Sequence, residues 1–303
     1  MREVNYKKGL SAFLVCFLIW GFQPLYWYIC GQWDTFFMLA CRIIWAAVCC
    51  LCILWIQGKL PQLWAVFRDR QSLKREIPAA VFLLADWGVY LWAVQNGRVL
   101  ECSLGYYIQP LVVFALGAVI FREKMNWRHF VIIAIVVVGI VFSTSGFGGV
   151  PYVTIILAAC FAVYAAIKKS LVIDSVVSTT AEILMMVPAA LLFILLFRMG
   201  DTGMASITPL RQLMLLGAGV ITAMPMVLYS VGVKYLPLTT AGFCQYLSPT
   251  LAIVCGAVMG EYLTPEKLKS FYFIWAGVIL YCLNTIYEER KRRKQLRAEP
   301  ENG

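Results

Sequence analysis

Two apolar stretches of the sequence carry polar residues beside a proline. Residues 105–120 read GYYIQPLVVFALGAVI, and residues 242–259 read GFCQYLSPTLAIVCGAVM. Aligning Pro110 with Pro249 gives an offset of 139 residues, which also superimposes the Gly-Ala-Val triplet that follows each proline. A proline inside a helix removes one backbone donor and frees the carbonyl four residues earlier. We therefore predict a helix break at each of these prolines.

The carbonyls that these prolines would free belong to Tyr106 and Gln245. Gln109 lies on the same helical face as Tyr106, so a polar side chain accompanies each freed carbonyl. Such backbone is tolerated at membrane depth where it lines a wet cavity or is buried in protein. We predict a substrate-binding surface here. The alternative is a kink packed against small residues such as Gly117 and Gly256.

One cation falls inside an apolar run. Arg42 lies about seven residues into that run, which is roughly 10 Å deep at about 1.5 Å per residue. An arginine at membrane depth costs about 2.5–3.5 kcal/mol on insertion scales, so its side chain should face the interior and find a partner. The candidate partners are Asp86 and Glu101, and the role is either a structural ion pair or substrate gating.

Three carboxylates in apolar runs are candidates for proton coupling. They are Asp86, Glu101 and Glu182, of which the last is expected to pair with Lys168 or Lys169. Burial in a low-dielectric medium favours the neutral form of a carboxylate, so such a group can take up a proton.

Aromatic residues inside the runs form a second candidate set for substrate contact. Stacking and cation-π contacts would suit planar or cationic substrates, whereas packing alone is the plainer interpretation of any one ring. With the two glutamines, the predicted substrate-binding residues are Trp20, Trp87, Trp92, Tyr106, Gln109, Tyr164, Tyr229, Gln245 and Tyr246.

The elements that must position these residues are membrane-spanning helices. The 303 residues are 61% hydrophobic and only 14% charged, against roughly 25% charged in soluble domains, and the mean hydropathy is +0.78. About 20 apolar residues cross a bilayer, and the first run has no cleavage site, so we expect it to stay in the chain. The predicted spans are 9–29, 36–56, 77–96, 100–121, 129–146, 151–168, 178–198, 212–233, 238–259 and 270–287.

The basic residues predict the orientation. Twenty of the 26 Lys and Arg fall on the side that holds both termini, and five fall on the other. Positive loops stay in the cytoplasm, so we expect a multi-pass protein of the inner (cytoplasmic) membrane with both termini inside. The net charge of +10 then needs no nucleic-acid partner.

The sequence similarity between residues 103–123 and 242–261 extends to two halves. Five spans in each half mean that the second half enters the membrane from the opposite face, as in the inverted repeats of secondary transporters. We predict an all-α fold of ten transmembrane helices in a 5+5 inverted repeat. Its parts are residues 1–148, residues 149–290 and a basic cytoplasmic tail, 291–303.

Several runs resemble one known family. They are IWGFQPLYW, CRIIWA, DWGVYLWAVQNGRVLECSLGYYIQPLV, VYAAIKK, AEILMMVPAA, GFCQYLSPTL and FIWAGVILY. The chain is similar over nearly its whole length to RarD-type permeases in the EamA branch of the drug/metabolite transporter superfamily. The resemblance implies ten helices and export of small molecules by alternating access. Asp86 departs from that pattern, because the family usually has asparagine before this tryptophan.

Together these features predict a secondary transporter and not an enzyme, since no nucleophile and base pair stands out in the sequence. We expect a small amphipathic or aromatic metabolite or drug as substrate, proton coupling through one of the carboxylates, and no cofactor or metal site, since His129 is the single histidine. The alternatives are import or exchange of a nutrient or cofactor, or a membrane receptor or scaffold. The sequence leaves the oligomeric state open.

Overall fold

The computed structural model describes residues 2–30, 34–120, 127–169, 171, 173–196, 209–235 and 244–298. Within these ranges the chain is helical and contains no strand. The helices are α1 Arg2–Cys30, α2 Thr35–Ile56, α3 Leu60–Arg68, α4 Arg70–Gln95, α5 Val99–Ile120, α6 Trp127–Gly146, α7 Tyr152–Lys169, α8 Ser175–Leu196, α9 Pro209–Tyr235, α11 Leu247–Val258 and α12 Pro265–Ala298.

The expected all-α membrane fold is confirmed. Each of the ten predicted spans overlaps one helix. Over their described residues, six of these helices are long and apolar enough to cross a membrane, and the other four are shorter apolar helices. The ninth predicted span, 238–259, lies in part outside the described residues. The tail expected from residue 291 continues α12 as a helix as far as Ala298.

The short helix α3 was not predicted. It occupies the stretch between the second and third predicted spans, which the sequence analysis treats as a loop. A proline in its first turn is compatible with helix initiation, and Leu63 and Val66, three residues apart, are its buried positions. This spacing puts both side chains on one helical face, so α3 lies against the bundle.

The two prolines behave differently from the prediction. Pro110 lies inside α5, which continues unbroken from Val99 to Ile120, so the predicted break at Pro110 is wrong. A bilayer helix tolerates proline where its neighbours compensate for the lost bond, and α7 and α11 pack against α5. Pro249 lies in the first turn of α11, after a turn at Tyr246 interrupts the ninth span. The interruption therefore precedes Pro249 by three residues.

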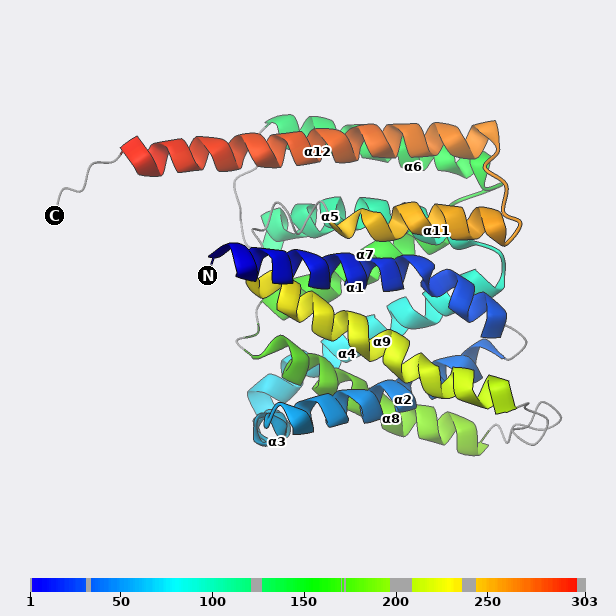
Figure 1. Ribbon diagram of the computed structural model, residues 1–303. Coiled ribbons are helices and arrows are strands. Elements are labelled where there is room, and N and C mark those ends of the chain that lie inside the picture. Colours follow the sequence, from blue (N-terminus) through cyan, green and yellow to red (C-terminus); the bar gives the residue numbers. More distant parts are fainter. Residues whose placement is uncertain are drawn as a thin grey trace.

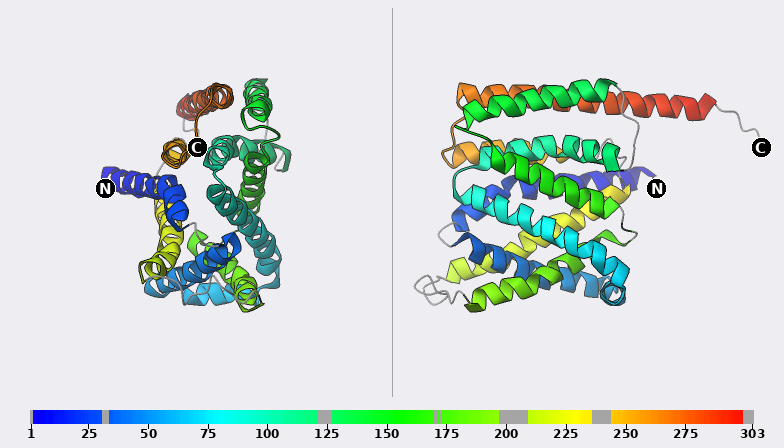
Figure 2. Two further views of the ribbon diagram at one scale, coloured as in Figure 1. Left: turned by 90° about the vertical axis from the view of Figure 1, so that its right-hand side faces the viewer. Right: turned by 180° about the vertical axis from the view of Figure 1, so that it is seen from behind.

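The helices form one bundle whose two ends are distinct. The N-terminal start of α1 and the C-terminal end of α12 lie at the same end, and α12 projects beyond the other helices there (Figure 1). The further views show α6 and α12 side by side along one edge of the bundle (Figure 2).

Contacts between helices follow a repeated pattern. Numbered by predicted span, α1, α2, α4, α5 and α6 correspond to α7, α8, α9, α11 and α12. Helix α1 packs on α9, and its counterpart α7 packs on α4, the counterpart of α9. In the same way, α5 packs on α7, and its counterpart α11 packs on α1. The pairs α2 with α8, α5 with α11 and α6 with α12 join corresponding helices. This arrangement places most of the interhelical packing between residues 1–148 and 149–290.

The start of α8 is tied to the linker before α3. Asp174 accepts hydrogen bonds from the backbone N–H groups of Val176 and Val177 at 3.0 and 3.3 Å, which caps the helix. The ammonium of Lys59 lies 2.7 Å from the Asp174 carboxylate. Burial raises the pKa of Asp174, but the hydrogen bonds from Lys59, Val177 and Val176 and the positive charge of Lys59 together outweigh burial, so the pKa lies below its usual value.

Two equivalent glycines allow α6 and α12 to approach closely. A Cβ atom at Gly139 would lie 2.9 Å from Ile274 Cγ1, and one at Gly277 would lie 2.5 Å from Val136 Cγ2. Larger side chains at these positions would therefore force the helices apart, as in other membrane helix pairs that meet through small residues.

We expect Gly277→Leu to lower the stability of the protein by about 1–3 kcal/mol, because overpacking a close contact forces neighbouring atoms to move. Ala276→Leu is the matched control, since Ala276 is exposed on the same helix. Thermal unfolding of both purified variants in detergent measures the difference. Equal midpoints for the two variants would show that the close contact is unimportant.

Candidate functional site

The centre of the bundle holds a buried cation between two indole rings. The guanidinium carbon of Arg42 lies 5.2 Å from the ring centroid of Trp27 and 4.2 Å from that of Trp87. Arg42 is only 4% exposed, and its Nε donates a hydrogen bond to Thr222 Oγ1 at 3.2 Å. Helices α1, α2, α4 and α9 therefore all contribute to holding one charge.

A carboxylate stands near this cation without contacting it directly. Asp86 is 5% exposed and interacts electrostatically with Arg42, but no ion pair joins the two groups. Asp86 Oδ1 and Arg42 Nη1 are both buried and have no hydrogen-bond partner in the structure. Buried polar groups are nearly always satisfied, so this unmatched donor and acceptor favour a site that receives a polar ligand or water.

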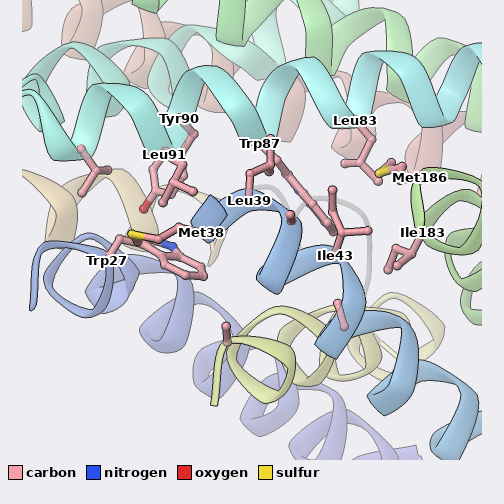
Figure 3. Packing of buried hydrophobic residues seen from close by; sticks show 14 of the residues in the cluster. Trp27, Met38, Leu39, Ile43, Leu83, Trp87, Tyr90, Leu91, Ile183 and Met186 are labelled. Carbon is pink, nitrogen blue, oxygen red and sulfur yellow. The ribbon is translucent and has the colours of Figure 1, made fainter. Parts of the chain in front are cut away.

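Two tyrosines complete this group. The rings of Tyr90 and Tyr106 lie 5.9 Å apart, and both tyrosines interact electrostatically with Arg42. Figure 3 shows Trp87 and Tyr90 extending from α4 toward the side where Trp27 of α1 lies. We call this group the central cluster: Trp27, Arg42, Asp86, Trp87, Tyr90, Tyr106 and Thr222.

Four members of the central cluster are predicted site residues, namely Arg42, Asp86, Trp87 and Tyr106. Sequence reasoning missed Trp27, Tyr90 and Thr222. Tyr90 follows Asp86 by four residues, and this helical spacing would have placed it on the same face. Thr222 is 180 residues from Arg42 in the chain, and no local pattern links the two.

A separate apolar cavity adjoins α2 and α4, and no member of the central cluster lines it. Its volume is about 620 Å³, within the range of roughly 300–1,000 Å³ that is usual for small-molecule pockets. It lies between α2, α4, α7 and α8. Among the predicted site residues only Trp92 lines it, whereas Ile43 and Ala85 line it as sequence neighbours of Arg42 and Asp86.

Of the two candidate partners of Arg42, Glu101 pairs with another cation. Glu101 lies 2.6 Å from the guanidinium of Arg98, three residues earlier at the start of α5. The same guanidinium lies 4.1 Å from the Tyr152 ring centroid and 5.7 Å from that of Trp92. A closer cation, directly before the helix that carries Glu101, therefore takes the carboxylate.

Glu182 pairs with a lysine, as the sequence predicted. Lys168 Nζ lies 2.8 Å from Glu182 Oε1, and the hydroxyl of Tyr164 donates to Glu182 Oε2 at 3.1 Å. Ser178 and Glu76 adjoin them. We call these five residues the carboxylate cluster. Glu76 was missed because the third predicted span begins one residue after it.

The remaining predicted residues lie elsewhere. Trp20 and Tyr229 pack together between α1 and α9, with ring centroids 5.9 Å apart. Tyr246 stacks on Tyr107 at 6.1 Å. The aromatic set is therefore divided among separate clusters. Within the described ranges, no group of three His, Cys, Asp or Glu residues is arranged to hold a metal ion.

The predicted binding surface between the two proline segments is a helix contact over its described residues. Ser103 Oγ donates to the backbone carbonyl of Pro249 at 2.7 Å, and the hydroxyls of Tyr107 and Thr250 are 2.6 Å apart. Gln109 is buried and Gln245 is half-buried, but these polar contacts join α5 directly to α11. The packing alternative describes this part of the interface better.

The family model of the EamA-like transporter family matches residues 7–145 and again residues 149–283. The chain belongs to the EamA-like transporter family. "Uncharacterized transporter YojE" of Bacillus subtilis is 35% identical over 298 residues, covering 96% of this chain and 98% of the relative. "Protein RarD" of Escherichia coli is 26% identical, covering 95% and 98% of the two chains.

These matches make the chain a RarD-type EamA permease and a multi-pass membrane transporter. A solved structure titled "Crystal structure of protein" has a TM-score of 0.60 at 17% identity, and the match covers 95% of this transporter and 100% of that chain. At this identity the likeness shows the fold alone.

A double-mutant cycle tests whether the two central charges of this transporter interact. We expect Arg42→Met and Asp86→Asn together to differ from the sum of the single variants by about 0.5–3 kcal/mol in stability, because each change removes the other group's compensating charge. Thermal unfolding in detergent provides the four values. As a control, Arg42→Met combined with Glu101→Gln should be additive, since Glu101 has its own cation. Additivity in the first cycle would contradict the interaction.

Proposed function

We propose that this transporter is a secondary active transporter that moves small amphipathic or aromatic molecules across the cytoplasmic membrane by alternating access. The observation that carries the proposal is the central cluster, where a buried guanidinium N–H group and a buried carboxylate oxygen have no partner. Such a pair can bind the polar groups of a substrate, and the surrounding indole and phenol rings can contact its apolar or planar part.

The position of the central cluster supports movement between the two halves of the chain. Arg42 and Asp86 come from residues 1–148, whereas Thr222 comes from residues 149–290. The family model matches each of these parts in turn, as expected for two related halves. A ligand bound between inverted repeats is exposed to either face as the repeats rock against each other.

Export is our first choice of direction, because the resemblance to RarD-type permeases implies it. Import or exchange of a nutrient or cofactor is the alternative, since coupling and gradients set the direction. We also propose that both termini face the cytoplasm. The shared end of α1 and α12 in Figure 1 supports this orientation together with the distribution of Lys and Arg.

A ligand screen separates the central cluster from the other aromatic clusters. A compound present at about 100 times its Kd should stabilise the protein by about 2.7 kcal/mol. We expect amphipathic aromatic compounds that raise the unfolding temperature of the wild type to lose this effect in Trp87→Leu and keep it in Trp20→Leu. Trp20→Leu is the control because Trp20 packs against Tyr229, outside the central cluster. The opposite result would place the binding site between α1 and α9.

Cysteine labelling in intact cells tests the orientation. We expect a membrane-impermeant maleimide to label Val150→Cys from outside and to label Lys291→Cys only after permeabilisation. Both positions are exposed. Val150 follows the end of α6, which packs against the beginning of α12 at Lys267, whereas Lys291 lies near the opposite end of α12. The protein without an introduced cysteine gives the background labelling of the native cysteines. Labelling of Lys291→Cys in intact cells would overturn the proposed orientation.

A further inference from the structure

The carboxylate cluster joins the two halves of the chain through buried polar groups. Glu76 lies on α4 and Glu182 on α8, and both are fully buried at 0% exposed. The hydroxyl of Ser178 donates to Glu76 Oε1 at 2.6 Å and accepts a hydrogen bond from Lys168. Lys168 also forms the ion pair with Glu182. One ammonium therefore serves two carboxyl groups.

The remaining oxygen of Glu76 has no partner. Glu76 Oε2 is buried without a hydrogen bond in the structure, and the Glu76 and Glu182 side chains are close enough to hydrogen-bond to each other. Two carboxylates cannot form such a bond while both are ionised, because neither has a proton to donate. One proton would satisfy this geometry and would also balance the charge against Lys168.

Among the pairs that the described side chains form, Lys168 is the cation beside these carboxyl groups. The groups that face the cluster are Tyr164 and Lys168 from α7, Thr179 from α8 and the thiol of Cys50 on α2, which lies against Thr180. Lys74 and Arg75 precede Glu76 on α4 but are exposed. A metal cation is disfavoured, because the ammonium of Lys168 already occupies the space beside Glu182.

We propose that Glu76 and Glu182 share one exchangeable proton, and that this proton holds the beginning of α4 against the beginning of α8. When the proton leaves, one carboxyl O–H bond breaks and the proton passes to water at the end of the bundle where the chain begins. Two buried carboxylates then face one lysine, and their repulsion opens the contact between the halves. The shared proton does not depend on the proposed function. Only the coupling of this opening to substrate movement rests on the proposed function.

Infrared spectroscopy of the purified full-length protein tests the shared proton directly. The neutral carboxylic acid has a carbonyl stretch that the carboxylate lacks. We expect wild-type protein labelled with ¹³C-glutamate to show an isotope-shifted carboxylic acid band at neutral pH that disappears as the pH is raised. An unshifted band would come from an aspartate, and an absent band would mean that both groups are ionised. Either result overturns the proposal.

Isosteric variants assign the band to the pair. Glu76→Gln and Glu182→Gln should each abolish the titrating glutamate band, because the remaining carboxylate then has Lys168 to itself. Glu101→Gln is the control, since it removes a buried carboxylate that already pairs with Arg98, and it should retain the band. A band that persists in both cluster variants overturns the assignment. If either variant fails to fold, the labelled wild type still decides whether a glutamate is protonated.

The same experiment separates this inference from the proposed function, because it requires no substrate. A titrating glutamate band in a protein that binds no screened compound would support the shared proton and count against the proposed substrate class. Substrate-dependent stabilisation without the band would overturn the shared proton and leave the proposed function intact.

Discussion

A cation inside an apolar bundle must be held by its neighbours, and the placement of Arg42 shows how this requirement organises the centre of the transporter. Water is scarce at membrane depth, so the charge is distributed over two indole faces and one hydroxyl instead of being neutralised by a contacting carboxylate. These neighbours come from α1, α4 and α9. Helix α2, which carries Arg42, and these three helices cannot shift independently without exposing the guanidinium to apolar surroundings. Arg42 therefore connects the two halves of the chain.

Helix α4 connects the polar groups along the bundle. It carries Glu76 near its beginning, Asp86 further along and Trp92 near its end. Glu76 and Asp86 are ten residues apart, which corresponds to about 15 Å along a helix. A rigid helix can transmit a small displacement over that distance. In our proposal, opening of the carboxylate cluster moves the beginning of α4, and the central cluster experiences the same movement through Asp86 and Trp87.

The sequence predicted the helices better than it predicted the site. Apolar length alone located the spans, because a bilayer requires long, internally hydrogen-bonded segments. It also identified Arg42, Asp86 and Glu182, since charges in apolar runs are conspicuous. The partners were harder to predict. Glu101 has a nearer cation in Arg98, and Thr222 meets Arg42 across 180 residues. Pro110 shows a further limit, because the chemistry of proline predicts a lost hydrogen bond but not whether neighbouring helices preserve the helix.

The two buried charges occupy equivalent positions in the two halves. Helices α2 and α8 each have 22 residues, and Arg42 and Glu182 are each the eighth residue of their helix. Because corresponding helices run in opposite directions in an inverted repeat, the same position lies toward opposite ends of the bundle. The first half places a cation there, surrounded by aromatic rings, and the second places a carboxylate there, beside a lysine and a second carboxyl group. In our proposals, this duplicated position supports two chemistries: ligand contact in the central cluster, and proton exchange nearer the end of the bundle where the chain begins.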